Sequence, residues 1–310
     1  MMCENAVNAR VPVAVPGARG SSPLLKKVAG AVAATAALGA ATAAYGHFIE
    51  LNNFQLRTES LPVLPAGSPD FRILHISDMH MIPGQQKKID FMHSLAALEP
   101  DLVMNTGDNL SHVDGMGPLL EALDPLMDFP GVFVPGSNCY FAPVFKNPAR
   151  YLWQPRTPQM IEEGSRVALP IERMHDAFES RGWTGLINRY DTLNLKGLRL
   201  EFSGVDDPHL RYDEHPGFAP GAFDEGEEPS VRIGVAHAPY MRTLHRFVQD
   251  GAQAIFAGHT HGGQVCLPGG HALVSNCDLP PSRAKGVSEQ SGIPVQVSAG
   301  LGTSRFAPVR

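Results

Sequence analysis

Short apolar runs alternate with stretches of helical periodicity from residue 71 onward. The run FRILHIS at 71–77 is compact and apolar, which predicts a buried strand. In the stretch 86–98 the apolar residues fall near one helical face, and Pro100 ends that helix. The same alternation predicts strands at 101–107 and 131–137 and a helix at 117–127. Strands and helices in this order predict right-handed crossovers and a parallel sheet.

The second half of the chain resumes this pattern after a less regular middle. Residues 141–170 hold several prolines and aromatic residues, which indicates a surface excursion or cap. Beyond them the pattern predicts helices at 170–180 and 240–249, and strands at 184–192, 196–203, 231–239, 252–258, 264–268 and 294–300. The expected fold class is therefore α/β, with the folded domain spanning residues 70–310.

An uncharged segment precedes the folded region. Residues 28–45 are 18 uncharged, Ala- and Gly-rich residues, about the minimum length for a membrane span. The flank 1–27 carries four basic side chains against one acidic, and 46–69 forms a polar, Pro-containing linker. Basic residues ahead of an apolar segment keep the N-terminus cytoplasmic. The pattern predicts a single-pass anchor in the cell membrane, with the folded domain on the extracytoplasmic side.

Two alternatives to this anchor stay open. The sequence ALGAATAA offers small-residue cleavage sites, so the segment could be a signal peptide and the protein secreted. An Ala-rich helix that packs on the domain would have a similar composition.

Composition and charge exclude several classes of protein. The chain has 25 basic and 31 acidic residues and a net charge of −6, which argues against a nucleic-acid partner. None of the four cysteines forms a CxxC pair, which argues against a thiolate zinc site and a disulfide scaffold. Cys266 and Cys277 could pair if the domain lies outside the cell. No HExxH motif supports a metallopeptidase.

Polar clusters follow five of the apolar, strand-like runs. The carboxyl edge of an open α/β sheet, where parallel strands end, is the usual place for a ligand site. Two carboxylates, one amide and four imidazoles there suit two divalent cations such as Mn, Fe or Zn, with no thiolate required. The candidate metal ligands are Asp78, His80, Asp108, Asn138, His237, His259 and His261.

The ordered set DxH, GD, GxN, H and GHxH resembles the calcineurin-like metallophosphoesterase family, over residues 71–310. The segments GHTHGGQVCLPGG and SAGLGTSR resemble its small, membrane-anchored bacterial branch, which includes UDP-diacylglucosamine pyrophosphatases. The resemblance implies a two-sheet sandwich flanked by helices in αββα layers. It also implies hydrolysis of a phosphodiester or pyrophosphate, on a lipid-linked or envelope substrate if the anchor is real.

The resemblance also implies a role for each ligand. Asp78, His80 and His261 would hold the first metal, and Asn138, His237 and His259 the second. Asp108 would bridge the two metals, because a shared carboxylate holds two cations close together against their repulsion. A hydroxide between the metals would attack phosphorus. His75, inside the first strand, is expected in the core or behind a metal-bound imidazole.

The third motif departs from the family pattern. The family reads GNH followed by Asp or Glu, whereas this chain reads Gly-Ser-Asn-Cys-Tyr at 136–140. In one register Asn138 is the amide ligand and Cys139 replaces the histidine; in the ungapped register Ser137 stands at the ligand position. We favour Asn138, because an amide oxygen is a better metal ligand than a neutral serine hydroxyl. In both registers the motif histidine is missing.

This departure has consequences for catalysis. A missing general acid slows hydrolysis by about 10²–10⁴-fold, and least for a good leaving group. His112 and His209, both in loops, could supply the proton, or they could be ordinary surface residues. Cys139 is a candidate catalytic residue as a metal ligand or redox sensor, or else a small buried residue beside the site. The alternative function is a metal-binding protein with weakened catalysis.

Overall fold

The computed structural model describes residues 23–144, 166–219, 230–263, 266–267 and 270–303. The chain divides into two compact units, with the boundary between Ala43 and Ala44. Helix α1, Pro23–Phe48, confirms the expected N-terminal apolar helix. By length and composition the stretch Lys26–Asn52 could cross a membrane, and a signal sequence would meet the same criteria.

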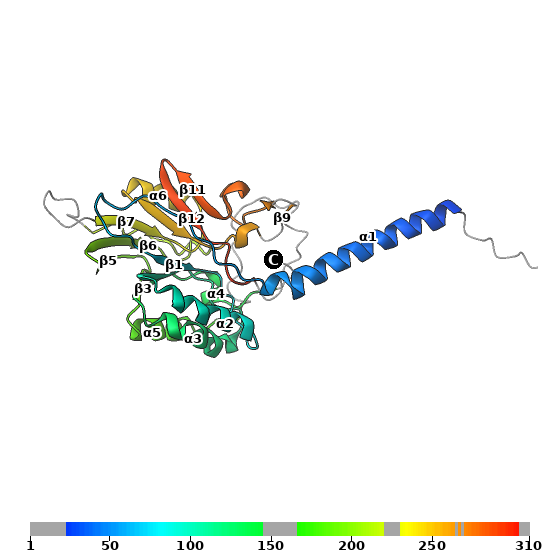
Figure 1. The fold of residues 1–310 in the computed structure, drawn as a ribbon, viewed down its shortest axis with the longest axis horizontal. Helices are drawn as coiled ribbons and strands as arrows, with labels where there is room; N and C mark the ends of the chain where they lie inside the picture. The colour runs from blue at the N-terminus through cyan, green and yellow to red at the C-terminus, as the bar shows by residue number, and fades with distance from the viewer. Residues whose placement is uncertain (1–22, 145–165, 220–229, 264–265, 268–269, 304–310) are drawn as a thin grey trace, which may run out of the picture. The chain divides into compact units, whose positions relative to one another are not determined.

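The second unit is built on two sheets (Figure 1). The smaller sheet has the strand order β1-β2-β3-β4, and all of its pairs are parallel. This confirms the parallel sheet expected from the strand–helix alternation. Its strands are β1 (Ile73–Ile76), β2 (Leu102–Asn105), β3 (Gly131–Phe133) and β4 (Thr184–Gly185).

The larger sheet has six strands in the order β11-β12-β8-β7-β6-β5. Its two outer pairs, β5 with β6 and β11 with β12, are antiparallel, and the inner pairs are parallel. The strands are β5 (Arg189–Leu195), β6 (Leu198–Gly204), β7 (Ser230–Val235), β8 (Ala254–Ala257), β11 (Gly286–Gln290) and β12 (Ile293–Val297). A small hairpin pairs β9 (Cys266–Leu267) with β10 (His271–Ala272).

Helices connect and cover the sheets. The α-helices of the second unit are α2 (Gln86–Ser94), α3 (Met116–Leu123), α4 (Ser137–Tyr140), α5 (Ile171–Ser180) and α6 (Met241–Gln249). Short 3-10 turns occur at Glu50–Asn52, Leu95–Leu98, Val113–Gly115, Asp124–Leu126, His261–Gly263 and Pro281–Arg283.

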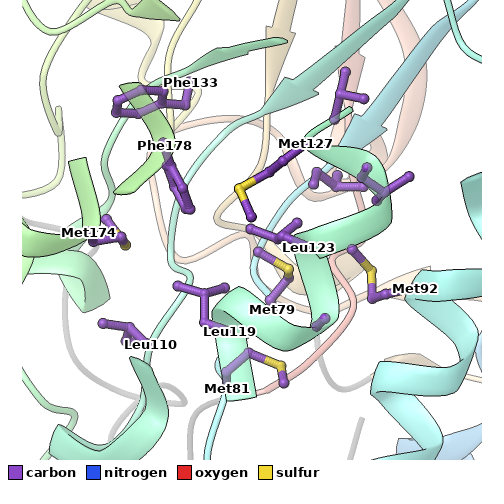
Figure 2. Packing of buried hydrophobic residues seen from close by; sticks show 14 of the residues in the cluster. Met79, Met81, Met92, Leu110, Leu119, Leu123, Met127, Phe133, Met174 and Phe178 are labelled. Atoms are coloured by element: carbon purple, nitrogen blue, oxygen red, sulfur yellow. The ribbon is translucent and has the colours of Figure 1, made fainter. Parts of the chain in front are cut away.

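Three apolar clusters hold the layers together. On strand β2, Val103 points to the cluster shared with α2, α3 and α5, whereas Leu102 and Met104 point to the cluster between the two sheets. Figure 2 shows the first of these, in which Phe133 of β3 packs edge-on against Phe178 of α5. Helix α6 covers the outer face of the larger sheet through the third cluster. This α–β–β–α layering confirms the expected sandwich.

The structure corrects several element boundaries. The strand expected at 184–192 is two strands in different sheets, because Asn188 adopts a left-handed conformation (φ 51°) that turns the chain between β4 and β5. The strand expected at 131–137 ends at Phe133, and residues 137–140 form the helical turn α4. Strand β11 was missed because its sequence, GVSEQ, is short and polar.

Cys266 and Cys277 do not form the disulfide considered from the sequence. Neither cysteine is part of a disulfide; Cys266 is exposed and Cys277 is buried.

Candidate metal centre

The predicted metal ligands lie on loops that follow five strands. Asp78 and His80 follow β1, and Asp108 follows β2. Asn138 lies in α4, directly beyond β3, and His237 follows β7. His259 and His261 follow β8. Both sheets therefore contribute side chains to one site at their carboxyl ends, as open α/β sheets do.

The backbone at this site is held in an unfavourable conformation. Five of the seven predicted ligands have left-handed φ values: Asp78 51°, His80 46°, Asp108 53°, His259 71° and His261 50°. Such a conformation costs about 1–3 kcal/mol for a residue other than glycine, and strain of this kind concentrates at functional sites. The surrounding loops must therefore fix the directions in which these side chains point.

Asp78, His80 and His261 form the first cluster. Their ligand atoms lie within 4.8 Å of one another, with 3.2 Å between His80 Nε2 and His261 Nε2. Asp78 Oδ1 lies 3.6 Å from His261 Nε2 and is buried without a hydrogen-bond partner among the described residues. The other oxygen, Oδ2, accepts hydrogen bonds from the Ser77 hydroxyl and the His259 amide. A buried, unpaired carboxylate oxygen that faces two imidazole nitrogens fits a cation.

Asp108, His237 and His259 form the second cluster. His237 Nε2 lies 3.4 Å from Asp108 Oδ2 and 3.2 Å from His259 Nδ1. His80 Nε2 of the first cluster lies 3.7 Å from the same Asp108 oxygen. The Asp108 carboxylate thus faces both clusters, which is the position that a bridging ligand requires.

Backbone carbonyls fix the orientation of two imidazoles. His237 Nδ1 donates to Thr106 O at 2.7 Å and His261 Nδ1 to Gly302 O at 2.9 Å. A carbonyl can only accept, so Nε2 of each of these rings faces its cluster and offers a lone pair when the ring is neutral. His259 Nε2 lies 3.2 Å from Asn276 O and 3.3 Å from the side-chain amide nitrogen of Asn276. His75 supports this arrangement, because its Nε2 is 2.9 Å from the Thr106 hydroxyl.

Asn138 lies against the Asp108 carboxylate. Its backbone amide donates to Asp108 Oδ1 and its side-chain amide to Oδ2, each at 2.7 Å. The oxygen and nitrogen of an amide are assigned from such hydrogen bonds. A 180° rotation of the Asn138 side-chain amide would put the Asn138 oxygen where its nitrogen now lies, next to Asp108 Oδ2. Asn138 is therefore close enough to Asp108 to bind the same metal ion.

Cys139 lies outside both clusters. It is fully buried, and its sulfur accepts weak hydrogen bonds from Gly136 N and the Asn109 amide. Burial, aided by the negative charge of Asp108, raises the pKa of this thiol to about 12. A protonated thiol is a poor nucleophile, and this sulfur belongs to neither cluster of candidate ligands. Of the two interpretations of Cys139, the structure favours a small buried residue beside the site.

In the metal-free protein, burial and neighbouring charges shift the pKa values of four candidate ligands. Burial alone would lower the pKa of His237, but the nearby carboxylates, above all Asp108, raise it to about 10. Burial likewise opposes ionisation of Asp108, yet His237 holds the pKa of that carboxyl well below its usual range. For His80 and His259, burial lowers the pKa well below 6.5. A cation that binds at His237 must therefore displace a proton.

Two glycines make room for the ligands. A Cβ on Gly136 would collide with the Asp108 carboxylate and lie 2.7 Å from the His237 ring. A Cβ on Gly258 would collide with Ser77 and lie 2.6 Å from Asp78 Oδ2. These positions therefore require glycine for close packing around the two carboxylates.

The two loop histidines differ in position. The His209 ring lies 4.7 Å from the His259 ring, measured between centroids, and its Nδ1 is 3.0 Å from the Tyr240 hydroxyl. His112 instead accepts a hydrogen bond from the Asp114 amide in its own turn. Asn276 and Gly302 also contact candidate ligands, Gly302 through its backbone carbonyl and Asn276 through its carbonyl and its side-chain amide. No motif in the sequence marks either residue.

The sandwich thus has two clusters of candidate oxygen and nitrogen ligands at its strand ends, an arrangement that could hold two metal ions. Residues 71–263, well over half of the chain, match the family model for calcineurin-like phosphoesterases. The chain belongs to the calcineurin-like phosphoesterase family, whose members depend on two metals and act on phosphate esters. The membrane-anchored branch suggested by the sequence stays a prediction.

Individual relatives are more distant. The uncharacterized protein YpbG of Bacillus subtilis (strain 168) is 27% identical over 215 residues, which cover 68% of this chain and 69% of YpbG. TT1561 of Thermus thermophilus is a similar solved structure, with TM-score 0.40, 12% identity, and coverage of 75% of this chain and 91% of that one. A dimetal phosphatase from Danio rerio has TM-score 0.40, 10% identity, and coverage of 76% and 88%.

Proposed function

We propose that this chain hydrolyses a phosphodiester or pyrophosphate bond with two divalent metal ions, Mn, Fe or Zn. In this proposal Asp78, His80 and His261 hold one ion. Asn138, His237 and His259 hold the other, and Asp108 is shared. The observation that carries the proposal is the approach of two imidazole nitrogens to 3.2 Å in each cluster, with the Asp108 carboxylate close to both clusters. A cation bound in a cluster would take the place of the proton between these nitrogens.

The residues of the chain have defined tasks in this reaction. Bound metal ions would lower the pKa of water and neutralise charge on the phosphoryl oxygens. Thr106 and Gly302 orient His237 and His261 through their backbone carbonyls, and Asn276 holds the His259 ring through its carbonyl and its side-chain amide. Asp108 contributes one negative charge at the centre of the site, which favours cations there.

The Gly-Ser-Asn-Cys sequence at 136–139 limits the class of substrate that we expect. Asn138 can donate a hydrogen bond but has no mobile proton, and the Cys139 thiol is buried. A substrate with an acidic leaving group, such as a nucleotide phosphate released from a pyrophosphate, needs the least help from a general acid. We therefore favour a pyrophosphate or an activated diester over a simple alkyl ester. The same sequence is the specific observation that favours the second candidate, a metal-binding protein with weakened catalysis.

The apolar helix α1 supports a membrane location for this activity. Anchored to the bilayer, with the N-terminus cytoplasmic and the folded domain outside, the protein would meet a lipid-linked or envelope substrate in the same surface. Removal of residues 1–43 should then release the protein into the soluble fraction, and protease added to intact cells or spheroplasts should reach the domain. A soluble full-length chain with an intact N-terminus would contradict the anchor, and a shortened N-terminus would indicate signal cleavage.

Metal-dependent hydrolysis of bis-p-nitrophenyl phosphate by the full chain in detergent tests the activity. The protein is stripped with a chelator and reloaded with Mn²⁺, and Asp108→Asn is the matched variant. We expect hydrolysis that needs Mn²⁺ and falls at least about 100-fold in the variant. Two bound metals per chain without hydrolysis of this ester or of a pyrophosphate would favour the weakened-catalysis candidate instead.

A further inference from the structure

The loop 205–212, which follows β6, brings His209 to the metal centre from outside the predicted ligand set. The ring of His209 lies 4.7 Å from the ring of His259, and the side chain is half-buried. His209 thus stands beside the second metal cluster with part of its surface open to solvent. This is a position from which a side chain can reach a substrate held by that cluster.

The backbone around His209 is fixed by buried groups. The fully buried Asp207 accepts hydrogen bonds from His209 N at 2.9 Å and from Leu210 N at 3.3 Å. Arg242 of α6 donates to Pro208 O at 2.9 Å. These bonds hold the turn in one conformation, so the direction of the His209 side chain is set before a substrate binds.

The same loop is tied to the motif that lacks its histidine. The Tyr140 hydroxyl lies 2.7 Å from both carboxylate oxygens of Asp206, which is itself buried. Tyr140 belongs to the helical turn α4 that carries Asn138. The Tyr140–Asp206 contact therefore joins α4, where the family motif has its histidine and this chain does not, to the loop that carries His209.

Tyr240 orients the His209 ring. Its hydroxyl lies 3.0 Å from His209 Nδ1. Burial raises the pKa of the Tyr240 phenol, and the nearby Cys277 and Asp207 raise it further. The hydroxyl therefore keeps its hydrogen. We assign the phenol as the donor to Nδ1, which places the imidazole N–H at Nε2. The ring then has a hydrogen-bond donor at Nε2 while it stays neutral.

We propose that His209 contacts the substrate and donates a hydrogen bond from Nε2 to the oxygen that leaves phosphorus. It would thereby replace the histidine missing from the motif at 136–140, and this inference rests on the proposed hydrolytic function. In the reaction a water oxygen bonds to phosphorus, and the bond from phosphorus to the leaving oxygen breaks. The leaving oxygen takes the bonding electron pair and a proton from solvent. His209 stabilises the charge on that oxygen and keeps its own proton.

Two substitutions separate this role from packing against His259. His209→Phe keeps a ring beside His259 but has no donor, whereas His209→Gln keeps a donor but no ring. The matched control is His112→Phe, which changes the other half-buried loop histidine. All proteins are full-length, in detergent, reloaded with Mn²⁺ and checked for equal metal content.

Hydrolysis and phosphate binding are both measured. We expect His209→Phe to lower kcat/KM about 10-fold for bis-p-nitrophenyl phosphate and about 100-fold for an ester with a poorer phenol leaving group. Inorganic phosphate, followed by calorimetry, should bind about 10-fold more weakly to this variant. His209→Gln should retain more of both properties than His209→Phe, and His112→Phe should match the unmodified protein.

Several results would overturn the inference. Unchanged phosphate affinity and rates in His209→Phe would show that no substrate contact exists. A larger loss in His209→Gln than in His209→Phe, or loss of metal in both, would show that the ring only packs against His259. If the unmodified protein binds Mn²⁺ and phosphate without hydrolysis, the proposed function fails separately. Phosphate affinity in His209→Phe then decides the inference: a 10-fold loss supports the contact, and an unchanged value overturns it.

Discussion

His80 and His261 present their Nε2 atoms to each other at 3.2 Å, although they are 181 positions apart in the chain. The Nδ1 atom of His261 donates to a backbone carbonyl, and Nδ1 of His80 lies 2.8 Å from the Ser111 hydroxyl. With Asp78 Oδ1 buried beside them and without a hydrogen bond from the described residues, the two nitrogens and this oxygen fit a shared cation.

Removal of one of these imidazoles should empty one metal position. His261→Ala should lower bound metal from two ions per chain to about one and reduce hydrolysis at least about 100-fold, because Asp78, His80 and the shared Asp108 would hold a divalent ion weakly without a second imidazole. Metal analysis after gel filtration measures the stoichiometry. His245→Ala, on the exposed side of α6, is the control and should keep both ions. Two tightly bound ions in His261→Ala would contradict the assignment of this ligand.

A methyl group at Gly136 should damage the site. Its Cβ would press on the Asp108 carboxylate and the His237 ring, so Gly136→Ala should displace the shared ligand and weaken metal binding at least about 10-fold. Gly117→Ala is the matched control, because nothing lies within 4 Å of its Cβ in helix α3. The control should keep full metal affinity and gain about 0.5–1 kcal/mol of stability. Equal metal affinity in the two variants, measured by titration, would be inconsistent with this packing.

His75 should make the metal-free protein sensitive to acid. Burial lowers the pKa of His75 to about 4, although Asp78 nearby acts in the opposite direction. The unfolded chain, with a histidine pKa of about 6.5, takes up a proton first as the pH falls. This contribution to stability is thus complete above pH 6.5 and is lost progressively as the pH falls toward 4.

His75→Phe tests this pH dependence, because it keeps a ring against Phe256 and cannot titrate. Between pH 7 and pH 5, urea unfolding in chelator should show a loss of about 1–2 kcal/mol more in the unmodified protein than in the variant. The lost bond to Thr106 lowers stability of the variant equally at both pH values. Parallel pH profiles for the two proteins would refute a depressed pKa at His75.

The cysteines should differ sharply in reactivity. With its pKa raised to about 12 and no exposure to solvent, Cys139 should resist iodoacetamide in the folded protein at pH 8, whereas the exposed Cys266 should react. Mass spectrometry in a Cys3→Ser background distinguishes these sites. Cys139→Ala should keep hydrolysis within about 10-fold. Loss of hydrolysis in that variant at unchanged metal content would restore Cys139 as a catalytic candidate.

The sequence indicated which side chains gather at the sheet edge, because each candidate ligand follows an apolar strand within a few residues. The alternation of strands and helices was enough to predict the layers of the fold. Neighbouring apolar residues such as Leu102 and Val103 lie on opposite faces of one strand, so both faces of the sheet are covered. It did not predict the left-handed turn at Asn188, which depends on backbone amides of Asp206 and Glu214 far along the chain. Nor could it separate His209 from His112, because both are loop histidines and only tertiary packing distinguishes them.

The most direct measurement is anomalous diffraction from crystals of the protein loaded with Mn²⁺, recorded on both sides of the manganese absorption edge. The account predicts two peaks about 3.5–4 Å apart. One would lie among Asp78, His80 and His261, the other among Asn138, His237 and His259, with Asp108 between them. A single peak, or two peaks that share no carboxylate, would contradict the dimetal centre.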